Sequence, residues 1–163
     1  MSPSVRAAVS YGVVLGLSVA GWTLVMGVTG WYRDPALQAA FFLVIPIQIA
    51  VVVALLRRTS KEHGYRGQVA LGTLASAVAA PIVLVQSLVF TTVLFPSYFD
   101  DLRAAHEALL RGEGVPEGEI AIRVAAAAEA NGSAWSNALT GAIATIVTGL
   151  VVSLVTAAFA RKR

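Results

Sequence analysis

Two glutamines, Gln48 and Gln86, are the most polar side chains deep inside the long apolar stretches of this 163-residue chain, away from their ends. Each lies close to a proline, Gln48 to Pro46 and Gln86 to Pro81. Proline removes a backbone donor and clashes with the preceding helical turn, so we expect a kink in both helices. Polar groups between kinked membrane helices can line a path for a substrate or an ion. Alternatively, the amides bond across helices or satisfy carbonyl groups that the prolines leave free, and we favour this second interpretation.

Few other residues could carry out chemistry. The chain has no cysteine, which excludes disulfides, thiolate metal ligands and cysteine nucleophiles. Its two histidines, His63 and His106, fall on opposite sides of the membrane in the topology derived below, so they cannot share a metal ion. No nucleophile elbow, phosphate-binding loop or metalloprotease motif occurs. We therefore predict that the protein is not an enzyme and has no catalytic residue, metal site or cofactor.

The composition is that of a membrane protein. Apolar residues make up 57% of the chain and charged residues only 13%, against about 25% charged residues in an average soluble domain. Four stretches have the roughly 20 residues that an α-helix needs to cross the hydrocarbon core. The predicted spans cover residues 7–30, 36–56, 67–96 and 134–160. None of them contains Asp, Glu, Lys, Arg or His, which argues against a proton-coupled transporter.

The charged residues that flank the spans predict the orientation. One side has eight basic residues and only one acidic residue, and the other side has four basic and eight acidic residues. Because basic residues next to membrane spans stay in the cytoplasm, the first side is predicted to be cytoplasmic, together with both termini. Its residues are Arg6, Arg57, Arg58, Lys61, Glu62, Arg66, Arg161, Lys162 and Arg163.

The predicted cytoplasmic loop between spans two and three contains four basic residues, Arg57, Arg58, Lys61 and Arg66. They are candidates for contact with anionic lipid headgroups. The chain carries a net charge of +3, but no basic stripe or recognition motif accompanies it. We therefore expect the lipid bilayer, and not nucleic acid, to be the partner of this charge.

The long segment between the last two spans has a pattern of its own. Residues 97–132 predict an extracytoplasmic hairpin of two short helices. Asp100 and Asp101 lie near the favourable N-terminus of the first helix, and Pro116 can open the second. The apolar stripe of the first helix packs on the membrane surface, on the second helix or on a partner, and the sequence does not separate these.

Small residues recur at helical spacing in three of the spans, where they allow helices to pack closely in lipid. We favour packing within one four-helix bundle. The alternative is that the face of the fourth span binds a second copy or a partner subunit. The candidate packing residues are Gly12 and Gly16 in the first span, Gly72 in the third, and Gly141, Thr145, Gly149 and Ser153 in the fourth.

The order of these features resembles a bacterial family. The resemblance rests on Gly67-Gln68, on Phe95-Pro96, on Gly-Val-Pro-Glu-Gly-Glu-Ile at 114–120, and on the apolar ending at 149–159 before Arg-Lys-Arg. With these the chain resembles the Domain of Unknown Function 4199 family of small four-helix membrane proteins. The resemblance implies a four-span fold and the bacterial cytoplasmic (inner) membrane. It implies no activity.

The sequence as a whole predicts an all-α integral membrane protein that forms a single membrane domain. It has four transmembrane helices, both termini in the cytoplasm, and a short extracytoplasmic helical hairpin between spans three and four. For function we expect an accessory or structural subunit that interacts with other membrane proteins or with itself. The alternative is a small transporter or channel-forming oligomer that uses the kinks in spans two and three.

Overall fold

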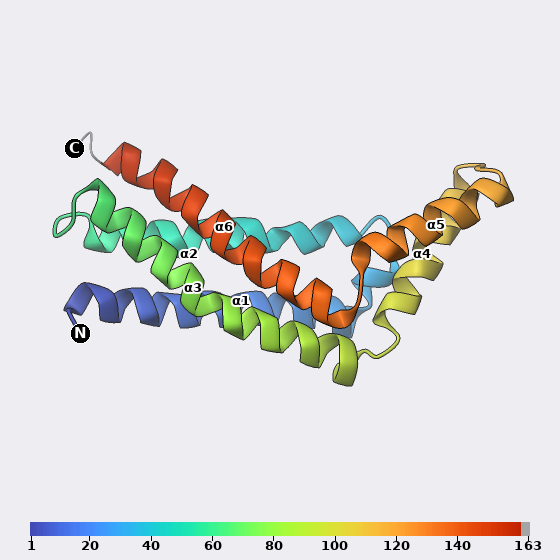
Figure 1. Ribbon diagram of the computed structural model, residues 1–163, viewed down its shortest axis with the longest axis horizontal. Coiled ribbons are helices and arrows are strands. Elements are labelled where there is room, and N and C mark those ends of the chain that lie inside the picture. The colour runs from blue at the N-terminus through green and yellow to red at the C-terminus, as the bar shows by residue number, and fades with distance from the viewer. Residues whose placement is uncertain (161–163) are drawn as a thin grey trace.

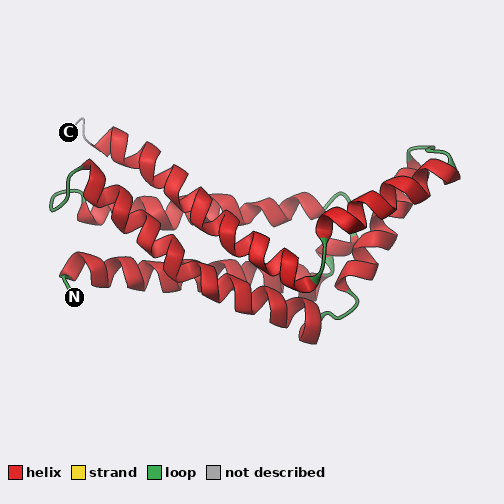
Figure 2. Ribbon diagram, viewed as in Figure 1, coloured by secondary structure: helices red, strands yellow, loops and turns green. Residues whose placement is uncertain are grey.

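The computed structural model describes residues 1–160, with side chains at all of these positions except 130, 131 and 160. The described chain consists of helices joined by short loops (Figure 2). The four long helices are α1 (Pro3–Thr29), α2 (Val44–Thr59), α3 (Tyr65–Val89) and α6 (Ala134–Ala160). Two shorter helices, α4 (Tyr98–Gly112) and α5 (Glu117–Asn131), stand between α3 and α6. Three short segments complete the chain: η1 (Trp31–Arg33), η2 (Gln38–Leu43) and η3 (Phe90–Leu94).

Four helical segments are long and apolar enough to cross a membrane, which confirms the predicted number of spans. They are Pro3–Thr29, Gln38–Thr59, Tyr65–Leu94 and Ala134–Phe159. The second span begins as the 3₁₀-helix η2 and continues as α2, and the third ends in the π-helix η3. The protein is therefore an all-helical, multi-pass membrane protein.

Helix α3 holds the central place in the bundle. It packs along α1 on one side and along α6 on the other, while α2 packs on α1 and α6. The start of α1, the end of α6 and the α2–α3 loop lie at one end of the bundle (Figure 1). The α4–α5 hairpin lies at the opposite end and continues beyond it (Figure 1).

Helix α1 approaches α3 through two glycines. A Cβ atom on Gly12 would lie 2.8 Å from the Cβ of Val78 and would overlap the carbonyl oxygen of Ala75. A Cβ atom on Gly16 would lie 2.8 Å from the Cβ of Ile82. Real Cβ atoms do not come this close to other atoms, so both positions require glycine at the present helix separation.

Helices α3 and α6 contact each other through two glycine–serine pairs, Gly72 with Ser153 and Gly149 with Ser76. The hydroxyl of Ser153 occupies the space where a Cβ on Gly72 would stand, and the hydroxyl of Ser76 does the same at Gly149. Ser76 and Ser153 are completely buried. Because lipid supplies no hydrophobic drive between helices, such close packing is the main attraction that holds the pair together.

The two prolines differ in their local structure. Pro46 lies in the first turn of α2, directly after the change from 3₁₀- to α-helix, where its missing N–H breaks few bonds. Pro81 lies inside α3 and does not end it. Both prolines are exposed on the outside of the bundle, so neither lines a path through its interior.

The close packing of α3 on α6 predicts how a substitution at Gly149 changes the stability of the protein. Gly149→Ala places a methyl group on the Ser76 hydroxyl and should lower the free energy of unfolding by about 1–3 kcal/mol. The matched control is Gly141→Ala, since the nearest atom to a Cβ at Gly141 is the Cγ1 of Val83 at 3.8 Å, an ordinary contact. Equilibrium unfolding in mixed micelles measures both variants. Adding Ser76→Gly to Gly149→Ala should restore part of the loss, and an unchanged Gly149→Ala variant would contradict the packing.

Candidate functional site

The hairpin is attached to the bundle by a cluster centred on Asp101, which we call the hairpin anchor (Tyr32, Arg33, Ser97 and Asp101). One carboxylate oxygen, Oδ2 of Asp101, accepts hydrogen bonds from the Tyr32 hydroxyl at 2.9 Å, from Arg33 Nε at 3.0 Å and from the Ser97 hydroxyl at 3.0 Å. Arg33 also contributes its Nη2, 3.0 Å from the same oxygen. The anchor therefore joins the start of α4 to the turn after α1.

Aromatic rings pack beneath the anchor. The ring of Tyr32 meets those of Phe90, Phe95 and Tyr98 at centroid distances of 6.5, 6.1 and 5.1 Å. Phe90 and Phe95 also occupy the space where a Cβ on Gly27 would stand. The π-helix η3 brings these two rings to the same place, because its last turn closes with a bond from the Phe95 N–H to the Phe90 carbonyl. Tyr32 is only 4% exposed, so it belongs to a packed core and not to a lipid-facing belt.

Electrostatics favour the anchor at neutral pH. Desolvation, the largest single influence on Asp101, raises its pKa, but the hydrogen bonds from Tyr32, Ser97 and Arg33 outweigh it. The pKa of Asp101 therefore lies below its ordinary value of 3.8. Burial, followed by the hydrogen bond to Asp101, raises the pKa of Tyr32 above its ordinary value. Asp101 is thus charged and Tyr32 protonated across the physiological range, as their hydrogen bond requires.

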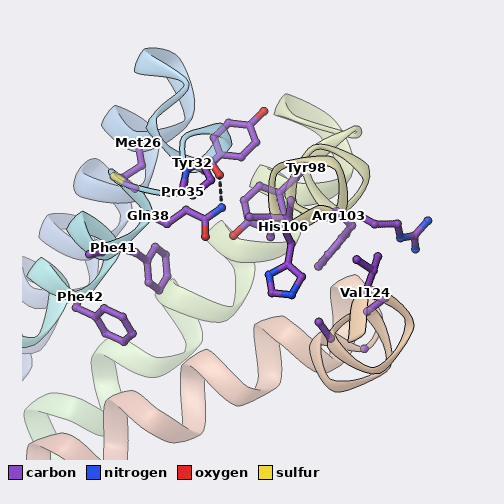
Figure 3. A pocket seen from close by; sticks show the side chains of 16 residues that line it. Met26, Tyr32, Pro35, Gln38, Phe41, Phe42, Tyr98, Arg103, His106 and Val124 are labelled. Carbon is purple, nitrogen blue, oxygen red and sulfur yellow. Dashed lines mark hydrogen bonds between the residues drawn. The ribbon is translucent and has the colours of Figure 1, made fainter. Parts of the chain in front are cut away.

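A cavity of about 580 Å³ lies between the anchor, the η2 segment and the hairpin. Figure 3 shows Gln38, Phe41 and Phe42 on one side of it and His106 and Val124 on the other. This volume lies within the range typical of small-molecule sites, about 300–1,000 Å³. Its walls are mostly apolar and aromatic, and they consist of Met26, Tyr32, Pro35, Gln38, Ala39, Phe41, Phe42, Tyr98, Phe99, Leu102, Arg103, His106, Val124, Ala127, Ala128 and Gly132.

The hairpin carries its own set of ion pairs. Arg111 bonds to Glu107 at 2.7 Å and to Glu117 at 2.9 Å, which links the end of α4 to the start of α5. Arg123 bonds to Glu119 at 2.6 Å within α5. Gly132, with a φ of +65°, then ends α5 and allows the chain to turn into α6. Helix α5 packs on α4, and Ile122 on its outer face is 70% exposed.

The two intramembrane glutamines lie apart. Gln48 is 5% exposed, and its Nε2 donates to the carbonyl of Thr145 on α6 at 2.5 Å. It lies next to Gly149, and therefore next to Ser76. Gln86 is half-buried on α3, ten residues beyond Ser76 and thus about 15 Å further along the helix. Gln48 therefore belongs to the contact between α2 and α6, and the structure does not form one polar path from both glutamines.

The small residues of α6 face the interior of the bundle. Thr145, Gly149 and Ser153 are buried and Gly141 is half-buried. Gly141 faces Val83 of α3, as Gly149 faces Ser76. The packing face that the sequence analysis singled out is thus occupied within the chain, and the outer face of α6 carries aliphatic side chains, among them Ile143, Val147 and Val151.

The four candidate lipid-headgroup residues lie at the end of the bundle where α1 begins and α6 ends. Arg57, Arg58, Lys61 and Arg66 are all exposed. Glu62, in the same loop, accepts a hydrogen bond from the Ser4 hydroxyl at 2.6 Å, which ties the loop to the start of α1. Among the described residues, no group of three or more His, Asp or Glu side chains is placed to hold a metal ion.

Comparison with protein families places the chain. The model of a family described as "Protein of unknown function (DUF4199)" matches residues 10–162, nearly the whole chain. The chain belongs to the DUF4199 family. A search of curated proteins found no match, and a search of solved structures found none either. The DUF4199 match covers every span and the hairpin, so the anchor and the cavity both lie within the family's region.

Sequence reasoning missed both the anchor and the cavity. It assigned Asp101 to the N-terminus of a helix. The available signal was the concentration of aromatic residues with Asp101 and Arg33 at the ends of three different spans. Their convergence depends on how the spans pack, which a single sequence does not show.

The anchor makes a prediction about the hairpin's position. Asp101→Ala removes the shared acceptor, so the hairpin should move relative to the bundle. Spin labels at Ala121→Cys in α5 and Thr140→Cys in α6 can report this motion, since the chain has no other cysteine. We expect a narrow distance distribution in the parent protein and a broad one with Asp101→Ala. The control Glu119→Ala breaks an exposed ion pair of little energetic weight and should leave the distribution narrow.

The same labels test the pH dependence. Because the pKa of Asp101 is lowered in the folded protein, the anchor's stabilisation is complete above the ordinary value of 3.8 and is lost as the pH falls through the folded value. The distribution should therefore stay narrow from neutral pH down to that range and broaden below it. Broadening near pH 6 would contradict the assignment to Asp101.

Proposed function

We propose that this chain is a non-enzymatic accessory subunit of the bacterial cytoplasmic membrane whose α4–α5 hairpin binds another membrane protein. The observation that carries the proposal is the position of the hairpin. It extends beyond the end of the bundle (Figure 1), it is fixed there by the hairpin anchor, and α5 packs on α4 with its outer face uncovered. A rigid helix pair held away from its own bundle can present a surface without large ordering costs on binding.

The outer face of α5 suits contact with a helix of a partner. Ile122 stands on it, and Ala121, Ala125 and Ala126 around it are exposed. Small side chains allow a second helix to come close, and one large apolar side chain among them can fill a depression on the partner. The ion pair between Arg111 and Glu117 links the end of α4 to the start of α5 without covering this face.

The charge of the hairpin indicates the kind of partner. Residues 97–132 contain three arginines and seven aspartates or glutamates. An acidic hairpin is repelled by anionic lipid headgroups, which favours projection from the membrane over lying on it. It is attracted to a basic extramembrane surface, which speeds encounter and helps to select the partner.

The other candidate function, a small transporter or channel-forming oligomer, has less support. Gln48 is bonded to the Thr145 carbonyl, and Pro46 and Pro81 lie on the exposed surface. The small-residue faces of α1, α3 and α6 pack on one another. What remains outside the bundle is aliphatic surface suited to lipid and the hairpin suited to a protein.

Photo-crosslinking in native membranes tests the proposal. A photoreactive amino acid in place of Ile122 should give an adduct with one defined membrane protein. The matched control is the same replacement at Val147, which is 53% exposed on the lipid-facing side of α6 and should give no such adduct. An adduct with a second copy of the chain, or no protein adduct at Ile122, would contradict the subunit role.

A further inference from the structure

The cavity beneath the hairpin opens at the membrane boundary. Met26, on its wall, stands three residues before the end of α1, and Phe41 and Phe42 stand near the start of the second span. Phe42 is 67% exposed and Phe41 44%. Further along the same span, Ile45 and Ile49 are each 41% exposed. The cavity's aromatic wall is thus continuous with surface that lies against lipid.

Polar groups line this apolar space from two sides. Gln38 points toward the cavity from η2, and the Tyr98 hydroxyl and His106 ring do so from α4 (Figure 3). The Nε2 of Gln38 donates to the carbonyl of Tyr32 at 3.1 Å, which fixes that side chain. Neither the Tyr98 hydroxyl nor the His106 ring is hydrogen-bonded to another residue of the cavity wall (Figure 3). Burial raises the pKa of Tyr98, so its hydroxyl remains a proton donor.

Arg103 of α4 lies at the rim of the cavity. It belongs to the cavity wall, and its side chain is 54% exposed and 3.8 Å from the carboxylate of Asp100. In Figure 3 its guanidinium group points away from the cavity. It therefore adds positive charge near the entrance, while the interior is lined by the polar groups of Tyr98, Gln38 and His106.

We infer that this cavity binds a glycerophospholipid of the surrounding leaflet. One acyl chain lies among Phe41, Phe42 and Phe99, and the phosphodiester accepts hydrogen bonds from Tyr98 and His106. Three observations carry the inference: an apolar wall continuous with the lipid-facing surface, donors from α4 on the opposite wall, and a volume of about 580 Å³, within the range of small-molecule sites. A bilayer lipid reaches this site by lateral movement, without crossing water.

The site goes beyond the proposed function and does not depend on it. Its walls come from η2, α4 and α5, whereas the proposed docking face is the outer side of α5. A lipid in the cavity would pack against both the bundle and the hairpin, and so would add to the attachment that the anchor provides.

Native mass spectrometry tests the site. The purified protein is placed in bilayer discs of phosphatidylethanolamine and phosphatidylglycerol and released stepwise from the surrounding lipid. We expect one phospholipid per chain to remain when the others are lost. Val124→Trp fills the cavity from α5 and should abolish this retention. The matched control Ile122→Trp places the same side chain two residues away, outside the cavity wall, and should retain the lipid.

Tyr98→Phe tests the headgroup placement without changing the packing of the ring. Loss of one hydrogen bond to a charged phosphate should lower the affinity about tenfold, and with it the fraction of chains that retain the lipid. Equal retention by the parent protein and Val124→Trp would overturn the inference. So would wild-type retention by Tyr98→Phe, or retention of free fatty acid or detergent in place of phospholipid.

Discussion

The close approach of α3 to both α1 and α6 is the constraint on which the rest of the structure depends. Gly12 and Gly16 allow α1 to reach the backbone of α3. Gly72 and Gly149, each packed against a serine of the other helix, allow α3 and α6 to come equally close. Packing is the main attraction between helices in lipid. Because α3 packs on both α1 and α6, the position of its C-terminal end is fixed as well. The segment η3 that follows it therefore brings Phe90 and Phe95 against Gly27. The hairpin anchor is built on that aromatic base.

The anchor and the cavity share the first turn of α4. Asp101 bonds to Tyr32 and Arg33, while Tyr98, one turn earlier, packs on the Tyr32 ring and faces the cavity. Helix α4 therefore cannot leave the bundle without opening the cavity. A partner protein on the outer face of α5 and a lipid beneath the hairpin would both contact the segment that attaches the hairpin to the bundle.

The sequence predicted the parts of the fold that depend on local pattern. Uninterrupted apolar stretches gave the four spans, and the spacing of Gly141, Thr145, Gly149 and Ser153 gave the packing face of α6. Other features were not predicted, because they depend on tertiary contact. The second span changes from the 3₁₀-helix η2 to α2 at Val44, and the third span ends in the π-helix η3. Asp101 near the start of a helix has a favourable local role, so its place in the sequence offers no reason to predict its hydrogen bonds with Tyr32 and Arg33, about 70 positions away.

Labelling of single cysteines in intact cells is the measurement that tests the account most directly, because the charges beside the spans predict that the hairpin faces away from the cytoplasm. The chain has no cysteine of its own, so Gly118→Cys in the hairpin and Ser60→Cys in the loop after α2 can each be probed alone with a membrane-impermeant maleimide. We expect Gly118→Cys to react in cells whose outer barrier has been opened, and Ser60→Cys to react only after the cytoplasmic membrane is broken. The reverse pattern would place the hairpin in the cytoplasm and contradict the predicted orientation.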